Sequence, residues 1–254
     1  STVAWKDTAW WMNLTVDTVG QVFPITIDPS IIIKSDTSKM RDAGARSDIP
    51  TTNTGGDAEL ILEGSTTLIG RVYQWWNVSA IPYWVTVDSV RDSSYNNVGG
   101  AVGATNPQRM LLVKGAWTEM GITFNTQPAF DSTVSYFNFL HQTTDAAWTV
   151  IRSDSTGGAD SLRAWVQRWV NGTQTNYGVM RRYWVESSGT RNYVRFATKE
   201  DATAGNRPSL RVVYTSVWTP SAPSVDSSGS FLRIAVNRGS NPDSFKFVIW
   251  DSTS

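Results

Sequence analysis

The sequence predicts an all-β sandwich, and two patterns carry this prediction. Apolar and polar residues alternate along many short segments rich in β-branched and aromatic side chains, which is typical of strands with one buried face. Such segments occur at 14–16, 23–27, 60–62, 84–87 and 211–214. Turn sequences rich in Asn, Gly, Asp, Ser and Thr separate the segments, as at 54–57, 96–100 and 155–158. Many short strands joined by such turns favour a sandwich or barrel over other architectures.

One segment departs from the strand pattern and predicts a short helix. Apolar residues fall at helical spacing, at Leu162, Trp165, Val166, Trp169 and Val170. Asp160 or Ser161 is suited to cap the start of this helix, and Gly172 to end it. We therefore expect a helix of about three turns whose two tryptophans point into the sandwich, because a stripe at this spacing is usually core.

Composition narrows the classes of function. The chain has 254 residues, which fits one large all-β domain or two smaller ones. Its 22 basic and 22 acidic residues give zero net charge, so we expect no nucleic-acid partner. Charged residues make up only 17%, a polar but weakly charged surface that suggests an extracellular protein. No cysteine is present, so disulfides and thiolate sites are excluded, and 13 tryptophans are available for burial instead. No apolar run reaches the length of a membrane span.

Several motifs follow one another in an order that is informative as a set. They include an arginine-led strand from Arg71 that ends at Ile81-Pro82, and the segment 117–119 with the run from Gly121 to Ala129. The others lie at 21–30, 53–60, 166–178 and 195–214. Together they resemble the DNRLRE domain, a jelly-roll-like family of large secreted and cell-surface proteins that is related to a class of carbohydrate-binding modules. The resemblance covers about residues 21–215; the insert at 131–149 does not align. It implies a jelly-roll sandwich and a role in glycan binding.

The resemblance also sets the expected domain boundaries. A leading strand segment is expected at 1–20, the DNRLRE-like sandwich at 21–215 and a proline-punctuated linker at 216–224. The tail at 225–254 resembles the first half of a fibronectin type III repeat, and it is too short to close an immunoglobulin-like core of about 100 residues. Its strands would leave unpaired edges. Either the natural chain continues, or another chain completes this sheet.

Two tryptophan doublets suggest where a ligand could bind. Successive strand residues face opposite sides, so one member of Trp10-Trp11 and one of Trp75-Trp76 must leave the local core face. The resemblance places Trp76 inward; Trp75 stands where the family usually has a polar or basic residue. We therefore expect Trp75 to point outward, with Trp84 and Tyr95 as neighbours and Trp11 as a further candidate. Outward aromatics stack on sugar rings, but they also anchor protein interfaces, and both alternatives stay open.

Catalytic and metal signals are weak. His141 is the only histidine, and no spacing places a nucleophile beside a base, so we expect a protein without enzymatic activity. Calcium is the cofactor that sandwich loops most readily bind, through Asp and Asn oxygens and backbone carbonyls. The candidate ligands are Asp36, Asp57, Asp154 and Asp160. None has the spacing of an EF-hand, so solvated loop acids are the competing interpretation.

Two functions follow from these patterns. The first is a non-catalytic module of a large secreted or surface-exposed protein that binds glycan or mediates adhesion. The second is a structural subunit of an extracellular filament, sheath or phage virion, in which neighbouring copies complete the C-terminal sheet by strand addition. The expected partners are accordingly a polysaccharide or neighbouring protein subunits, including a homopolymer of this chain.

Overall fold

The computed structural model describes the backbone of residues 2–6, 9–13, 26–27, 30–34, 38–99, 107–139, 146–153, 161–217, 224–225, 231–235 and 246–250, and the side chains of 30–34, 38–98, 107–132, 146–153 and 161–215. By its contacts the chain divides into two units. One consists of Asp28–Thr215, and the other combines Ser1–Ile27 with Ser216–Ser254. The linker at 216–224 and the fibronectin-like module at 225–254 remain predictions.

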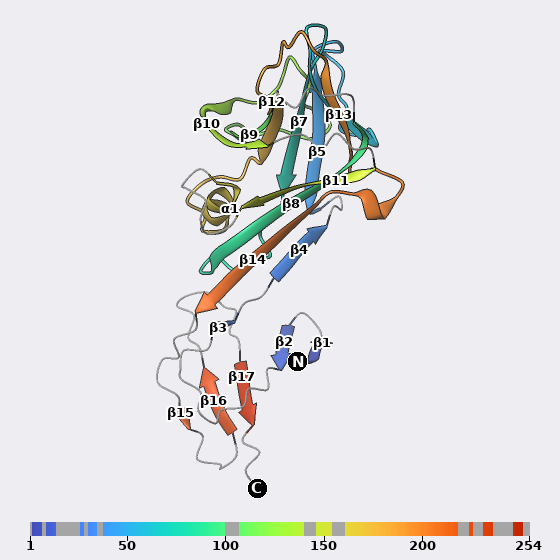
Figure 1. Ribbon diagram of the computed structural model, residues 1–254. Helices are drawn as coiled ribbons and strands as arrows, with labels where there is room; N and C mark the ends of the chain where they lie inside the picture. Colours follow the sequence, from blue (N-terminus) through green and yellow to red (C-terminus); the bar gives the residue numbers. More distant parts are fainter. Residues whose placement is uncertain are drawn as a thin grey trace. The chain divides into compact units, whose positions relative to one another are not determined.

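The larger unit is built from antiparallel strands (Figure 1). Its strands are β4 (Ser30–Lys34), β5 (Met40–Arg46), β6 (Glu59–Gly64), β7 (Ile69–Trp76), β8 (Thr86–Gly99), β9 (Gln108–Val113), β10 (Phe130–Phe139), β11 (Ala147–Ser153), β12 (Val179–Tyr183), β13 (Asn192–Ala197) and β14 (Ser209–Val217). A 3₁₀ turn, Ala204–Asn206, lies between β13 and β14.

The pairing order resolves these strands into two layers. In the first layer β12 lies between β9 and β7, with β10 beyond β9 and β5 beyond β7. In the second layer β11 pairs with one edge of β8, while β14 and then β13 pair with the other. β4 lies beyond β14, and β6 lies beyond β13. The β6–β7 hairpin joins the layers, so the predicted all-β sandwich is confirmed.

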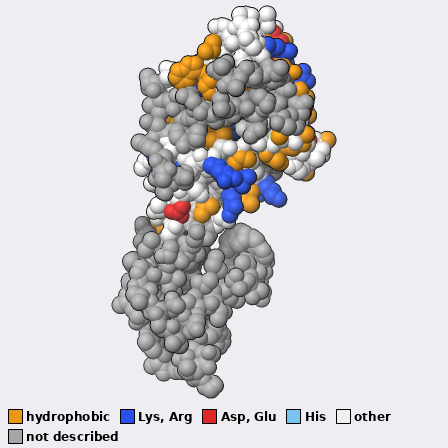
Figure 2. Space-filling model, viewed as in Figure 1, with side chains coloured by type: hydrophobic (Ala, Val, Ile, Leu, Met, Phe, Trp, Pro, Cys, Tyr) orange, Lys and Arg blue, Asp and Glu red, His pale blue; other side chains and the backbone are white. Residues whose placement is uncertain are grey.

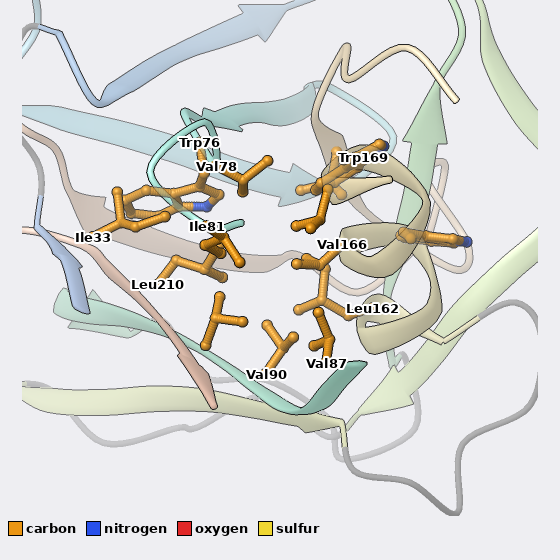
Figure 3. Close-up of a cluster of buried hydrophobic side chains, with 14 of the residues drawn as sticks. Ile33, Trp76, Val78, Ile81, Val87, Val90, Leu162, Val166, Trp169 and Leu210 are labelled. Carbon is orange, nitrogen blue, oxygen red and sulfur yellow. The ribbon is translucent and has the colours of Figure 1, made fainter. Parts of the chain in front are cut away.

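A continuous apolar core fills the space between the layers (Figure 3). Trp76 of β7 faces Ile33 of β4 and Leu210 of β14 in this core, which also holds Val87 and Val90 of β8. A second group between the layers gathers Leu60, Leu62, Val72, Tyr183, Val194 and Phe196. A third lies around Tyr73 and Met180 of the first layer and is covered by the segment that carries Trp117 and Phe124.

The helix α1 (Leu162–Val170) forms where the sequence predicts it. Ser161 caps its start by accepting a hydrogen bond from the Ala164 N–H, and Gly172 follows its end with a φ of +70°. Trp165 and Trp169 are buried in the core, which confirms their predicted packing. Gln167 fixes the helix to β8, because its side chain accepts from the Val87 N–H at 2.6 Å and donates to the Val85 carbonyl at 3.0 Å.

The smaller unit also consists of antiparallel strands. β1 (Thr2–Lys6) pairs with β2 (Ala9–Asn13), and β3 (Thr26–Ile27) pairs with the last two residues of β14. β16 (Phe231–Ala235) lies between β15 (Ser224–Val225) and β17 (Lys246–Trp250). Over the described part of the chain, no helix is long and apolar enough to cross a membrane.

Candidate ligand-binding face

The outer side of the second layer carries the largest set of unpaired cations that we find among the described side chains. We call it the arginine face and define it by the outward residues of four neighbouring strands. They are Trp148 and Arg152 of β11, Arg91 and Tyr95 of β8, Arg211 of β14, and Ile32 and Lys34 of β4.

Strand register aligns three arginines in one row across this face. Arg152 of β11 lies directly opposite Arg91 of β8, and Arg91 lies directly opposite Arg211 of β14. Directly paired residues share one side of a sheet, and neighbouring strands are about 4.8 Å apart. Three guanidinium groups therefore leave the sheet side by side, and all three residues are exposed.

These guanidinium groups have no partner in the described parts of the chain. No hydrogen bond or ion pair joins Arg91, Arg152 or Arg211 to another described side chain, and no outward residue from Ser89 to Tyr95, or opposite them, is acidic. Lys34, one row away, adds a fourth exposed cation. Figure 2 shows Lys and Arg side chains gathered over these strands. A hollow of about 300 Å³ lies among the three arginines and is also lined by Ser89, Val90, Ser153 and Val213.

An aromatic pair occupies the same face. Tyr95 and Trp148 are directly paired across β8 and β11, and their rings meet edge to face with centroids 5.3 Å apart. Trp148 is 39% exposed. Each ring lies four residues from an arginine on its own strand, about 13 Å along the sheet.

The face rests on a packed support. The residues that alternate with the arginines are buried: Val90 on β8, Ile151 on β11, and Leu210 and Val212 on β14. Because these side chains pack in the core between the layers, the strands that present the arginines are held in place. The arrangement is suited to binding an anionic ligand on a preformed surface.

The predicted ligand residues lie in separate places. Tyr95 is on the arginine face, but Trp75 is on β7 in the other layer. The Trp75 ring is half-buried, with the Arg41 guanidinium 4.3 Å from its centroid and its N–H donated to the Asn176 carbonyl at 3.0 Å. Trp84 packs against the main core. The side chain of Trp11 lies outside the described residues.

The predicted calcium ligands do not form a group. Asp57 is exposed in the loop after β5, and Asp36, Asp154 and Asp160 lie outside the described residues, as does His141. A different set of acids comes together instead: Asp42, Glu119 and Glu200 each place one carboxylate oxygen within 4.8 Å of the others. Burial, reinforced by the charges of Glu200 and Glu119, raises the pKa of Asp42 to about 8.

A larger hollow of about 710 Å³ lies at the end of β5, β6 and β13. Its two cations are already paired: Arg46 bonds Asp48 at 2.6 Å, and Arg195 lies 3.6 Å from Glu59. It therefore offers a ligand fewer free charges than the arginine face does.

The chain was compared with models of known protein families, and none matches. A comparison with curated proteins also finds no significant match. The resemblance to the DNRLRE domain therefore remains a prediction from the motifs.

Proposed function

We propose that this chain is a non-catalytic binding module that holds an acidic polysaccharide on its arginine face, on the outside of a cell or virion. The observation that carries the proposal is the row of Arg152, Arg91 and Arg211, three exposed cations that are directly opposed and have no partner among the described residues.

The row is unfavourable for the free fold, which is why it points to a ligand. Like charges directly opposite each other in a sheet destabilise it. An anionic ligand would remove this repulsion. Each guanidinium also offers planar donors that match a carboxylate or sulfate with two parallel hydrogen bonds.

The spacing favours a polysaccharide over a nucleic acid. Neighbouring arginines are one strand spacing apart, about 4.8 Å, which is close to the length of one sugar ring in a linear chain. A chain with one acidic group per sugar would thus meet one arginine per residue. Duplex DNA carries a charge every 1.7 Å or so, and its partners neutralise many phosphates with a broad positive field, whereas this chain has no net charge.

The aromatic pair gives the same ligand a second contact. Trp148 exposes part of its ring, and sugar rings pack their apolar faces on such surfaces. The pair lies about 13 Å from the row along the strands, whereas the row crosses the strands, so a branch or bend of the polysaccharide would make this contact. The resemblance to a family related to carbohydrate-binding modules supports the same assignment.

Binding to immobilised polygalacturonate, dextran sulfate and uncharged dextran tests the proposal on the full chain. We expect binding to the two acidic polymers, weakened by salt, and none to dextran. Arg91→Gln should lower the affinity roughly tenfold to a hundredfold, because it removes a charged hydrogen-bond donor at the centre of the row. Arg46→Gln removes the same charge from an arginine already paired with Asp48 and should leave binding unchanged.

Three outcomes would overturn the proposal. They are no binding to either acidic polymer, an equal loss in Arg91→Gln and Arg46→Gln, and tighter binding to duplex DNA than to the acidic polysaccharides. The last would assign the row to phosphate recognition instead.

A further inference from the structure

A carboxylate cluster that shares no residue with the arginine face joins three segments of the larger unit. Asp42 comes from β5, Glu119 from the connection between β9 and β10, and Glu200 from the turn after β13. One oxygen of each carboxylate lies within 4.8 Å of the other two. These segments are distant in sequence, so the fold, and no local motif, brings the three acids together.

Most of the polar atoms in this cluster already have partners. Glu119 Oε1 accepts the Asp42 N–H at 2.8 Å, and Asp42 Oδ2 accepts the Lys199 N–H at 3.1 Å. The Lys199 ammonium lies 2.8 Å from Glu119 Oε2 and 3.0 Å from Glu200 Oε1. Lys199 therefore neutralises part of the charge of the two glutamates.

Two carboxylate oxygens of this cluster have no hydrogen-bond partner among the described residues. They are Asp42 Oδ1 and Glu200 Oε2, and both atoms are buried. Asp42 itself is only 1% exposed. Three acidic side chains thus share one ammonium, and a buried carboxyl oxygen without a partner is costly. The lone pairs of these two oxygens accept no hydrogen bond from a described residue, which points to a further positive ligand.

We propose that Asp42, Glu119 and Glu200 bind a divalent calcium ion. Calcium binds oxygen ligands at about 2.3–2.6 Å, so two of its ligand oxygens lie at most about 4.6–5.2 Å apart. The three oxygens of the cluster, all within 4.8 Å of one another, meet this limit. Magnesium requires shorter, octahedral contacts and retains most of its waters, and zinc favours nitrogen and sulfur ligands. A site of carboxylates from three irregularly related segments is therefore suited to calcium.

The bound ion would tie β5 to the loop of Glu119 and the turn of Glu200. Gly55 packs against the backbone of Glu119 so closely that an added Cβ would lie 2.2 Å from the Glu119 carbonyl oxygen. Asn53 also donates to that carbonyl at 2.8 Å. The Glu119 loop is thus held in position beside Asp42, and the ion would hold the same loop from the other side.

Thermal unfolding of the full chain after removal of metal ions tests this site. Adding calcium to about 100-fold above its Kd should raise the Tm by roughly 5–10 °C, and magnesium should raise it much less. Asp42→Asn and Glu200→Gln should each abolish most of this rise. Asp57→Asn, which changes an exposed aspartate of a neighbouring loop outside the cluster, should keep it.

Binding of terbium, read by luminescence excited through the tryptophans, reports the same site without depending on stability. We expect a signal that calcium displaces in the wild type and in Asp57→Asn, and that Asp42→Asn loses. The proposal is overturned if calcium leaves both the Tm and the terbium signal unchanged. It is equally overturned if the cluster variants respond to calcium as Asp57→Asn does.

Discussion

The two faces of β8 use arginine in opposite ways. On the inner face Asp92 accepts a hydrogen bond from Arg181 of the other layer at 2.6 Å, and both side chains are essentially buried, at 1% and 0% exposure. On the outer face the adjacent residue, Arg91, is exposed between two further arginines. The inner pair joins the layers of the sandwich, whereas the outer row makes no hydrogen bond or ion pair with a described side chain.

This difference indicates what each set is for. A buried charge without a partner strongly destabilises a fold, so Arg181 is explained by its pairing with Asp92. The outer row has no such explanation, since removing it would relieve repulsion and break no contact among the described residues. A row of like charges that the fold does not need is the feature on which the proposed ligand rests.

Breaking the inner pair should have the largest effect. Arg181→Met leaves Asp92 buried without its cationic partner and should lower the free energy of unfolding by about 3–5 kcal/mol. Urea denaturation measures this loss. The double variant Arg181→Met with Asp92→Leu should regain most of it, because two apolar side chains restore a neutral core. A single variant within about 1 kcal/mol of the wild type would show that the pair does not hold the layers together.

Removing the charge of Glu186, which is half-buried between two arginines, should have an intermediate effect on stability. Glu186 bonds Arg71 at 2.6 Å and Arg182 at 2.8 Å. Burial alone would raise the pKa of Glu186, but its hydrogen bonds and the two positive charges outweigh burial and lower the pKa below its ordinary value of 4.5. A lowered folded-state pKa stabilises the fold above pH 4.5, and this contribution is lost as the pH falls.

Glu186→Gln should therefore cost about 1–3 kcal/mol near neutral pH, because charged hydrogen bonds are lost. The variant should also lose less stability than the wild type on acidification below pH 4.5, as measured by urea unfolding over a pH series. Asp48→Asn, which breaks the more exposed pair with Arg46, should change stability by less than about 1 kcal/mol. If the free energy of unfolding of the wild type and of Glu186→Gln fell equally below pH 4.5, the ionised Glu186 would not be what stabilises the fold.

Much of this fold follows from sequence patterns, since alternation marks the strands and helical spacing marks α1. Trp165 and Trp169 are core residues for the reason that their spacing predicts. The arginine row was not predictable in this way. Arg91, Arg152 and Arg211 each occupy an ordinary outward position of a strand, and only the register between three strands aligns them.

Contacts between segments that are distant in sequence explain the other differences between expectation and structure. Alternation places Trp75 and Trp76 on opposite sides of β7, but it cannot show that Arg41 of the neighbouring strand covers the Trp75 ring. Asp42, Glu119 and Glu200 come from β5, from the connection between β9 and β10, and from the turn after β13. No periodicity along the chain relates these residues, so the cluster appears only once the fold is known.

Substituting Arg91 should have the smallest effect on stability, and it tests the contrast between the two faces of β8 most directly. Arg91→Thr removes the central charge of the outer row and should raise the free energy of unfolding by about 0.2–1 kcal/mol, because it relieves repulsion from both neighbours. The gain should shrink in high salt, where exposed charges are screened. Arg91→Lys keeps the charge and should show no gain. A loss of stability in Arg91→Thr would mean that the row serves the fold, whereas a gain accompanied by weaker binding to polygalacturonate would mean that stability is sacrificed at this face for a ligand.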